Sequence, residues 1–146
     1  MTAYLLDANV LIALAWPQHV HHASAHKWFA KAGKRARATC AITQLAFVRI
    51  SSNPGIIPDA VSPREACNLL EKITELRRHH FWANTADVCS LDELKNLALV
   101  GYRQVTDAYL IGLARLHQGR IATLDGAMPA LASAMPGESS IVELIE

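Results

Sequence analysis

Apolar residues along this chain alternate between short continuous runs and stretches with helical spacing. The first run, Ala3 to Leu6, ends at the carboxylate of Asp7, and the next apolar positions recur at steps of three and four until Pro17. A short apolar run predicts a buried strand, whereas the wider spacing predicts a helix. The chain therefore begins with a strand, a carboxylate and a helix.

The same alternation continues to the end of the chain. Ser62, Pro63 and Glu65 form a helix start, with a capping serine, a proline at the first helical position and a glutamate at the capping-box position. Strands are predicted at Ala38–Ile42, His80–Ala83, Ile121–Leu124 and Ser140–Ile145. Helices are predicted at His22–Lys34, from Thr43 as the cap to Ile50, from Ser62 to about His79, and at Leu91–Leu99, Val105–His117 and Ala127–Ala134, with Gly119 placed to terminate the helix before it.

Strands that alternate with helices are typical of βαβ units. We therefore predict an α/β fold of three layers, with a mostly parallel five-stranded sheet between helices on both faces. The length suits one domain, and we expect residues 1–146 to form it. In such sheets, ligands bind at the carboxyl ends of the strands. Asp7 and Asp125 both follow a predicted strand, so both are candidates for a site there.

Composition excludes a membrane span. The longest apolar stretch, Ala3 to Trp16, contains Asp7 and Asn9 and is too short to cross a bilayer. No basic segment precedes it, as a signal peptide requires. With 51% hydrophobic and 18% charged residues, the chain has the composition of a globular protein. We expect a cytoplasmic location and no membrane partner.

The cysteines and the net charge do not point to a particular class of protein. Cys40, Cys67 and Cys89 are odd in number and lack paired spacing, so they support neither a disulfide framework nor a zinc site. A net charge of +1 gives no overall attraction to nucleic acid, so any such signal has to be local.

Three aspartates fall at positions where a carboxylate is costly. Asp7 and Asp125 follow apolar strands, and Asp107 lies in the first turn of the most apolar helix. A buried carboxylate needs a partner, a hydrogen bond or a cation. Each has a structural alternative, since Asp7 can cap a helix, Asp107 is favoured by the helix dipole and Asp125 precedes Gly126 in a turn pair. Together, three hard oxygen donors at one end of a sheet are typical of a magnesium or manganese site.

Four segments, LLDANVLIAL, TQLAFVRISSNP, VTDAYLIGLA and IATLDGAM, resemble in this order the PIN-domain ribonucleases, specifically the VapC-type toxins of bacterial toxin–antitoxin pairs. The resemblance covers Tyr4 to about Leu144. It implies a PIN-like fold and an endoribonuclease that uses Mg²⁺ or Mn²⁺ to hydrolyse RNA phosphodiester bonds with metal-activated water. It also implies that Asp7 is the bridging metal ligand, Asp107 a second ligand and Asp125 a third, acting directly or through water.

One position departs from the family pattern. Family members commonly place a glutamate after the threonine of the middle motif, where this chain has Gln44. A glutamine supplies an oxygen without a charge, so we expect weaker binding of the cation, unless Asp92 or Glu93 restores the charge. The alternative is a catalytically weakened PIN module that binds RNA or antitoxin without efficient cleavage. The supporting polar residues implied for the site are Asn9, Thr43, Gln44, Thr106 and Thr123.

Five positively charged residues follow one another closely between positions 27 and 37. A basic run without an acid is either a solvated helix face or a strip that contacts RNA phosphates. The run consists of Lys27, Lys31, Lys34, Arg35 and Arg37.

Arg49 matches a family position near the active-site groove, with a structural ion pair as the alternative. The resemblance also implies a second copy of the chain and a small VapB-like antitoxin as partners.

Two other classes of protein fit less well. The spacing of His19, His21, His22 and His26 matches none of the common zinc patterns. A phospho-accepting receiver domain needs a lysine on a late strand, and the last two predicted strands contain none.

Overall fold

The structure is a computed structural model of the chain, and it describes residues 2–31, 35–95, 101–134 and 140–146. Five strands form one sheet in the order β3-β2-β1-β4-β5, and every neighbouring pair is parallel. The predicted α/β fold with a five-stranded sheet is therefore confirmed, with a fully parallel sheet in place of a mostly parallel one. The strands are β1 (Tyr4–Leu6), β2 (Arg37–Thr39), β3 (His79–Phe81), β4 (Arg120–Thr123) and β5 (Val142–Leu144).

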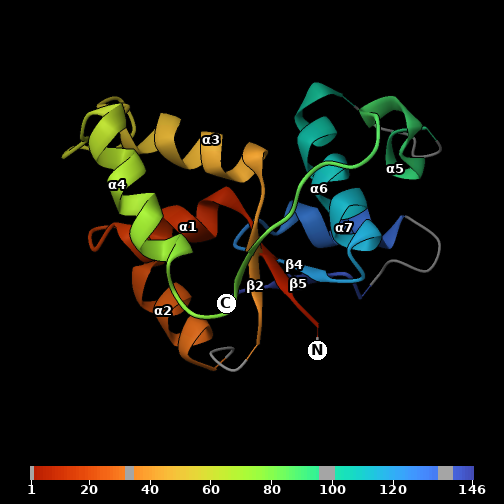
Figure 1. Ribbon diagram of the computed structural model, residues 1–146, viewed down its shortest axis with the longest axis horizontal. Helices are drawn as coiled ribbons and strands as arrows, with labels where there is room; N and C mark the ends of the chain where they lie inside the picture. Colours follow the sequence, from red (N-terminus) through yellow and green to blue (C-terminus); the bar gives the residue numbers. More distant parts are fainter. Residues whose placement is uncertain (1, 32–34, 96–100, 135–139) are drawn as a thin grey trace.

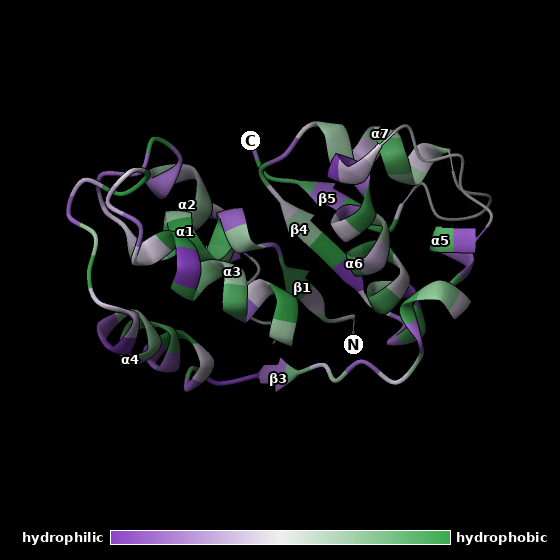
Figure 2. Cartoon of the chain, turned by 90° about the horizontal axis from the view of Figure 1, so that it is seen from above, coloured by the Kyte–Doolittle hydropathy of each residue, from purple (hydrophilic) through white to green (hydrophobic). Residues whose placement is uncertain are grey.

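Helices lie on both sides of this sheet, as Figures 1 and 2 show from two directions. No helix among the described residues has the length and hydropathy needed to cross a membrane. The helices are α1 (Ala8–Ala15), α2 (His22–Lys31), α3 (Ala41–Ser51), α4 (Pro63–Thr74), α5 (Asp92–Lys95), α6 (Val105–Leu116) and α7 (Ala127–Ser133), with short 3₁₀ turns η1 (Val88–Ser90) and η2 (Tyr102–Gln104).

The two faces of the sheet bury different hydrophobic clusters. Tyr4 and Leu6 of β1 pack on one face with α1 to α4, while Leu5 between them packs on the other face with α6 and α7. This alternation follows from the side-chain period of two in a strand. The central strand β1 is covered on both faces, and its three residues are all apolar and buried, as is usual for a strand inside a parallel sheet.

The junction between β2 and α3 differs from the prediction. The strand ends at Thr39 and the helix begins at Ala41, so Ile42 is helical. Cys40, not Thr43, occupies the N-cap position, with an extended backbone (φ −136°, ψ 171°). Thr43 lies one turn into the helix, where its hydroxyl accepts the N–H of Cys40 and donates to the carbonyl of Cys40, both at 3.1 Å. The apolar run could not show this boundary because buried strand and helix residues have the same composition.

The predicted start of α4 is confirmed. Ser62 is its N-cap and accepts the N–H of Glu65 at 3.2 Å. The helix ends at Thr74, earlier than predicted, because His79 already begins β3. Of the helix predicted at Leu91–Leu99, α5 covers Asp92–Lys95, and residues 96–100 lie outside the described part of the chain.

A close contact after α6 brings β4 beside β1. Gln118 adopts a left-handed conformation (φ 54°), and Gly119 follows it as the chain turns into β4. A Cβ atom on Gly119 would lie 2.4 Å from the Trp82 side chain and 2.7 Å from the carbonyl oxygen of Ala3. Only glycine fits this approach. Its lack of a side chain lets β4 pair with β1 and so carries Thr123 to the carboxyl end of β1.

Candidate functional site

Three aspartates lie at the carboxyl edge of the sheet, and we refer to Asp7, Asp107 and Asp125 as the acidic edge. Asp7 follows the last residue of β1, and its N–H donates to the carbonyl of Ala122 on the neighbouring strand at 3.0 Å. Asp125 follows β4, the parallel neighbour of β1. Asp107 comes from the first turn of α6. The topology thus brings Asp7 together with two residues that lie 100 and 118 positions later in the sequence.

Asp7 is held rigidly. It is the N-cap of α1, and its Oδ1 accepts the N–H of Ala8 at 2.8 Å. Its Oδ2 accepts the hydroxyl of Thr123 at 2.7 Å. The residue is only 9% exposed, and this burial raises the pKa of Asp7 even though both hydrogen bonds act in the opposite direction. Asp125 adds a smaller electrostatic repulsion.

The Thr123 hydroxyl connects three segments of the acidic edge. It donates to Asp7 and accepts the amide N–H of Asn9 at 3.3 Å and the backbone N–H of Asp125 at 3.0 Å. The other end of the Asn9 side chain accepts the N–H of Leu124 at 3.1 Å. Thr123 is fully buried, and all its hydrogen-bonding capacity is used. The structure thus brings Asn9 and Thr123, two predicted supporting residues, into contact with each other and with Asp7.

Asp107 is repelled by both other carboxylates of the acidic edge. Burial, followed by the negative charges of Asp7 and Asp125, raises the pKa of Asp107 to about 6. None of the lysines or arginines in the described part of the chain forms an ion pair with these three aspartates. Their mutual repulsion is therefore not offset by a basic side chain within these residues.

Asp125 and Thr106 lie at the exposed side of the acidic edge. Asp125 is exposed and its Oδ1 accepts the N–H of Ala127 at 2.9 Å, so it also stabilises the start of α7. Asp125 therefore has the structural role in a turn that the sequence also allowed. In addition, its charge raises the pKa of Asp7 and of Asp107. Thr106 is exposed beside Asp107 in the first turn of α6.

The chemistry of these donors suits a hard divalent cation, because all three are carboxylates whose charges repel one another. The described residues contain no group of three or more His, Cys, Asp or Glu side chains arranged to hold one ion. An ion at the acidic edge would therefore take one or two carboxylates and complete its shell with water, which is the usual arrangement for Mg²⁺.

Gln44 and Thr43 occupy different environments. Thr43 is buried and its hydroxyl bonds only within the start of α3, so its role is structural. The Gln44 amide nitrogen donates to the Thr39 hydroxyl at 2.9 Å, and that hydroxyl also bonds to Nε2 of His79 at 2.7 Å. The hydrogen bonds that join Thr39, His79 and Gln44 were not predicted. The one sequence feature that pointed to them is a threonine at the end of a buried strand, because a buried hydroxyl needs a hydrogen-bond partner. This pairing uses the amide nitrogen of Gln44, and its carbonyl oxygen carries no charge.

Glu93 does not restore the charge that Gln44 lacks. It is 3% exposed and forms a two-pronged ion pair with Arg115, at 2.7 and 3.0 Å. Its carboxylate is therefore already neutralised by a partner within the α5–α6 layer. Asp92, its neighbour, is exposed on α5. The expectation that Glu93 could serve the acidic edge is wrong.

The basic run does not form a continuous strip. Lys27 and Lys31 are exposed on α2, and Lys34 lies outside the described residues. Arg35 donates to the hydroxyl of Tyr4. Arg37 is 7% exposed and stacks on the Phe29 ring at 4.1 Å, so it cannot face solvent as part of a phosphate-binding surface. Aromatic packing at the start of β2 explains this burial.

Arg49 is exposed on α3, which begins beside the acidic edge. No acidic side chain pairs with it among the described residues, so the structural ion pair considered for it is not observed.

At the opposite, amino edge of the sheet, Arg120 and Glu143 form an ion pair at 3.1 Å. The hydroxyl of Tyr4 donates to Glu143 at 3.1 Å and accepts Nη1 of Arg120 at 3.1 Å. We call Tyr4, Arg35, Arg120 and Glu143 the amino-edge network. This network could not be predicted from the sequence, because its residues lie far apart in the chain.

Residues 4–133 match the PIN domain family, and the protein belongs to this family. Within it, the chain is 42% identical to ribonuclease VapC38 of Mycobacterium tuberculosis over 132 residues, which are 90% of this chain and 92% of that protein. Ribonuclease VapC39 of the same organism is 42% identical over 134 residues, covering 92% and 96% of the two chains. The protein is therefore a member of the VapC group of PIN-domain proteins, as the sequence resemblance predicted.

A solved structure agrees with the fold. VapBC2 from Rickettsia felis, bound to a DNA fragment from their promoter, matches with a TM-score of 0.67 and 12% sequence identity. The match covers 99% of this chain and 100% of the other. It confirms the PIN-like three-layer arrangement.

Proposed function

We propose that the protein is an endoribonuclease toxin that hydrolyses RNA phosphodiester bonds at the acidic edge with Mg²⁺ or Mn²⁺. The observation that carries this proposal is a set of three mutually repelling carboxylates without a basic partner in the described residues. Such a set is costly for stability and is typical of a cation-binding catalytic site. The names of its relatives, which are ribonucleases, support RNA as the substrate.

Each residue has a defined task in this proposal. Asp7, Asp107 and Asp125 bind the cation, directly or through water. Asn9 and Thr123 hold Asp7 and the Asp125 backbone in place through their hydrogen bonds. A bound divalent cation lowers the pKa of a water ligand and offsets negative charge on the scissile phosphate. No side-chain nucleophile is needed for this reaction.

Gln44 sets the strength of the site. Its amide oxygen carries no charge, so three carboxylates rather than four attract the cation, whether they bind it directly or through water. The competing proposal, a PIN module that binds RNA or antitoxin without efficient cleavage, rests on this single residue.

The surroundings of the acidic edge support a protein partner as well. Apolar side chains are exposed on α3, on η2 and in the first turn of α6, the helix that carries Asp107. Such side chains suit a peptide with an apolar face, and we propose that a VapB-like antitoxin covers them. A second copy of the chain is a further proposed partner, and with RNA as substrate we expect the protein to act in the cytoplasm. The exposed residues are Ile42 (39%) and Leu45 (62%) on α3, Tyr102 (81%) on η2 and Val105 (40%) on α6.

The test is RNA cleavage by purified protein. A panel of structured RNAs is incubated with Mn²⁺ or Mg²⁺, with and without a chelator, using wild type, Asp7→Asn and the exposed control Asp92→Asn. We expect cleavage by wild type and Asp92→Asn, loss with chelator, and loss in Asp7→Asn with an unchanged circular dichroism spectrum. Asp7→Asn should also lose growth arrest when expressed in a host cell.

Two outcomes would contradict this proposal. An Asp7→Asn protein that remains as toxic and as active as wild type excludes the acidic edge as the site. If wild type leaves every RNA intact while Gln44→Glu cuts them, the weakened-module alternative is correct.

A further inference from the structure

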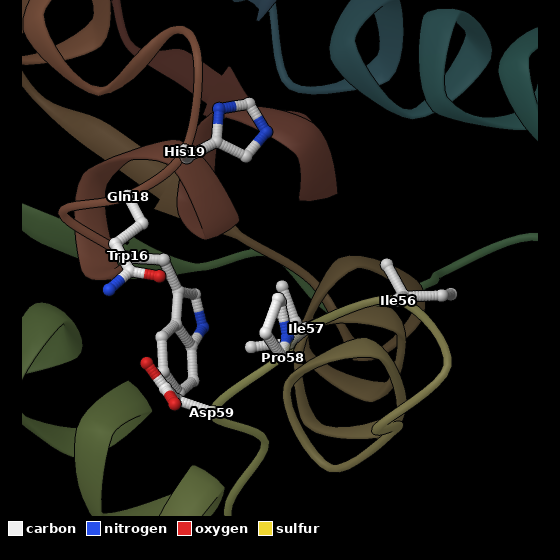
Figure 3. A pocket seen from close by; sticks show the side chains of 7 residues that line it. All are labelled: Trp16, Gln18, His19, Ile56, Ile57, Pro58 and Asp59. Carbon is white, nitrogen blue, oxygen red and sulfur yellow. The ribbon is translucent and has the colours of Figure 1, made fainter.

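A pocket of about 170 Å³ lies away from the acidic edge, between two loops. Trp16, Gln18 and His19 line it from the segment after α1. Ile56, Pro58 and Asp59 line it from the segment between α3 and α4. Figure 3 shows the indole of Trp16 and the ring of His19 on one side of the pocket, with Ile56 and Pro58 opposite.

Two helices connect this pocket to the acidic edge. Both α1 and α3 begin at that edge, α1 directly after Asp7 and α3 with Gln44 in its first turn, and both end beside the pocket. At about 1.5 Å per residue, the 8 residues of α1 span about 12 Å and the 11 residues of α3 span about 16 Å. The pocket therefore lies roughly 12–16 Å from the acidic edge.

The pocket has the size and the walls for one planar ring. Trp16 is held in place because its indole N–H donates to the Ser51 hydroxyl at 3.1 Å. Its neighbours across the pocket, Ile56 and Pro58, are apolar. A cavity of about 150 Å³ accommodates a benzene-sized ring. The 170 Å³ pocket is thus large enough for an aromatic heterocycle and too small for a folded peptide segment.

Polar groups surround this apolar space. Nδ1 of His19 accepts the N–H of His21 at 3.0 Å, so the neutral imidazole carries its proton on Nε2 and can donate from it. Burial, together with His21 and His22, lowers the pKa of His19 and favours this neutral form. Asp59 is exposed, has no ion-pair partner among the described residues and can accept. Gln18 can do both.

We propose that this pocket binds one unpaired base of the RNA and thereby contributes to the choice of cleavage site. An aromatic wall with donors and acceptors at its rim is how proteins recognise single-stranded bases. An apolar side chain of a partner would leave the Gln18, His19 and Asp59 groups unused, so a base fits better. This inference rests on the proposed ribonuclease function.

The distance between the acidic edge and the pocket predicts which base of the RNA is bound. At about 3.4 Å per stacked nucleotide, 12–16 Å corresponds to roughly four nucleotides from the scissile phosphate. Arg49 is exposed in the last turn of α3, at the end of the helix nearer the pocket, and a guanidinium there suits a backbone phosphate next to the bound base.

The first test measures base preference. A library of RNAs with randomised sequence is cleaved and the products are sequenced, using wild type, Gln18→Ala, Asp59→Asn and the control Glu71→Gln on the exposed side of α4. Gln18, Asp59 and Glu71 are all exposed, so these variants should fold normally. We expect wild type to prefer certain bases about four nucleotides from the cut, and the two pocket variants to lose that preference and to cleave the preferred RNA about fivefold to tenfold more slowly. The Glu71→Gln protein should behave as wild type.

The second test locates the base directly and does not depend on cleavage. The Asp7→Asn protein is irradiated with short RNAs that carry 5-iodouridine at successive positions, and the crosslinked peptide is identified by mass spectrometry. A crosslink to Trp16 or His19 from one position supports the inference.

The outcomes separate the inference from the function on which it rests. If wild type cleaves RNA but the pocket variants keep its base preference and no crosslink reaches Trp16 or His19, the inference is wrong and the ribonuclease proposal stands. If wild type cleaves no RNA, the ribonuclease proposal fails, and the crosslink alone decides whether a base is bound. Should Asp59→Asn weaken antitoxin binding about tenfold with RNA preference unchanged, the pocket binds protein and the inference is also wrong.

Discussion

The two ends of the central strands are built in opposite ways. At the amino edge, the charges of Arg120 and Glu143 neutralise each other and the Tyr4 hydroxyl bonds to both. At the carboxyl edge, three aspartates repel one another, and the described residues supply no basic partner. Since β1 and β4 are only 3 and 4 residues long, the two arrangements lie roughly 10–13 Å apart in one sheet.

The contrast shows which end is optimised for stability. The hydrogen bonds of the buried Tyr4 hydroxyl at the amino edge stabilise the folded state, whereas the like charges at the acidic edge raise its free energy. A fold that retains an unfavourable cluster in one place and a paired network in another is typical of a functional site supported by a stable scaffold. We therefore expect activity to depend on the acidic edge and stability to depend on the amino-edge network.

Asp107→Asn should have the largest effect, and only on activity. Removing this carboxylate takes away a predicted cation ligand and one repulsive charge. We expect RNA cleavage to fall by at least about 100-fold, because even outer-shell groups at metal sites contribute roughly 10- to 100-fold. Thermal unfolding of the metal-free protein should occur at the same or a higher temperature. Asp92→Asn, an exposed carboxylate in the first turn of α5, is the matched control. A lowered melting temperature in Asp107→Asn would show that Asp107 stabilises the fold instead.

Tyr4→Phe should show the reverse pattern. The variant keeps the buried ring but removes the hydroxyl that bonds to Glu143 and Arg120. We expect the free energy of unfolding, from urea denaturation, to drop by about 2 kcal/mol. Cleavage by the folded protein should stay within about twofold of wild type, a difference of less than 1 kcal/mol. A large loss of cleavage without loss of stability would show that the two ends are not independent.

Gln44→Glu should strengthen the acidic edge at a cost to the metal-free protein. A fourth carboxylate adds attraction for the cation and repulsion in its absence. We expect the dissociation constant for Mn²⁺, from calorimetry, to fall about fivefold, which corresponds to about 1 kcal/mol. Gln18→Glu adds the same charge at the distant pocket and serves as the control. Equal changes in both variants would mean that net charge, and not the site, determines the affinity.

The pH dependence of stability should show the smallest effect. The pKa of Asp107 is raised from its ordinary value of 3.8 to about 6, so the folded state binds this proton more tightly than the unfolded state. The resulting stabilisation is present below about pH 4 and is lost as the pH rises through 6. Allowing for the solvent that reaches Asp107, we expect wild type to lose about 1 kcal/mol relative to Asp107→Asn across this range without metal. Urea denaturation of both proteins at pH 4, 5, 6 and 7 measures the difference, and parallel curves would contradict the repulsion at the acidic edge.

Much of the fold follows from the sequence because its signals are local. Apolar runs and capping residues such as Ser62 predict where most helices and strands lie. The position of Asp7 directly after a strand indicates the edge of the sheet where a site should form. Boundaries were less predictable. Cys40 is a poor N-cap by type, so the start of α3 could not be found from sequence alone.

What the sequence could not show depends on contacts between distant segments. Nothing local distinguishes Arg37, stacked on Phe29 and buried, from its exposed neighbours in the same basic run. Likewise, nothing local in the sequence shows that the Glu93 carboxylate is paired with Arg115, which lies 22 positions later. The pocket beside Trp16 brings together two loops separated by about 40 residues, and no periodicity marks it.

Thr123 ties the chemistry of the protein to its unfolding. The hydroxyl that orients Asp7 belongs to a central strand, buried between the two hydrophobic clusters, and not to a surface loop. Loops can open while the rest of a domain stays intact, whereas central strands separate only when the whole domain unfolds. Heating should therefore not produce a folded protein with a disordered acidic edge. The orientation of Asp7 should persist up to the global melting transition and disappear with it. The entropy cost of ordering this carboxylate is therefore part of the entropy cost of folding and is not added when a cation or substrate binds.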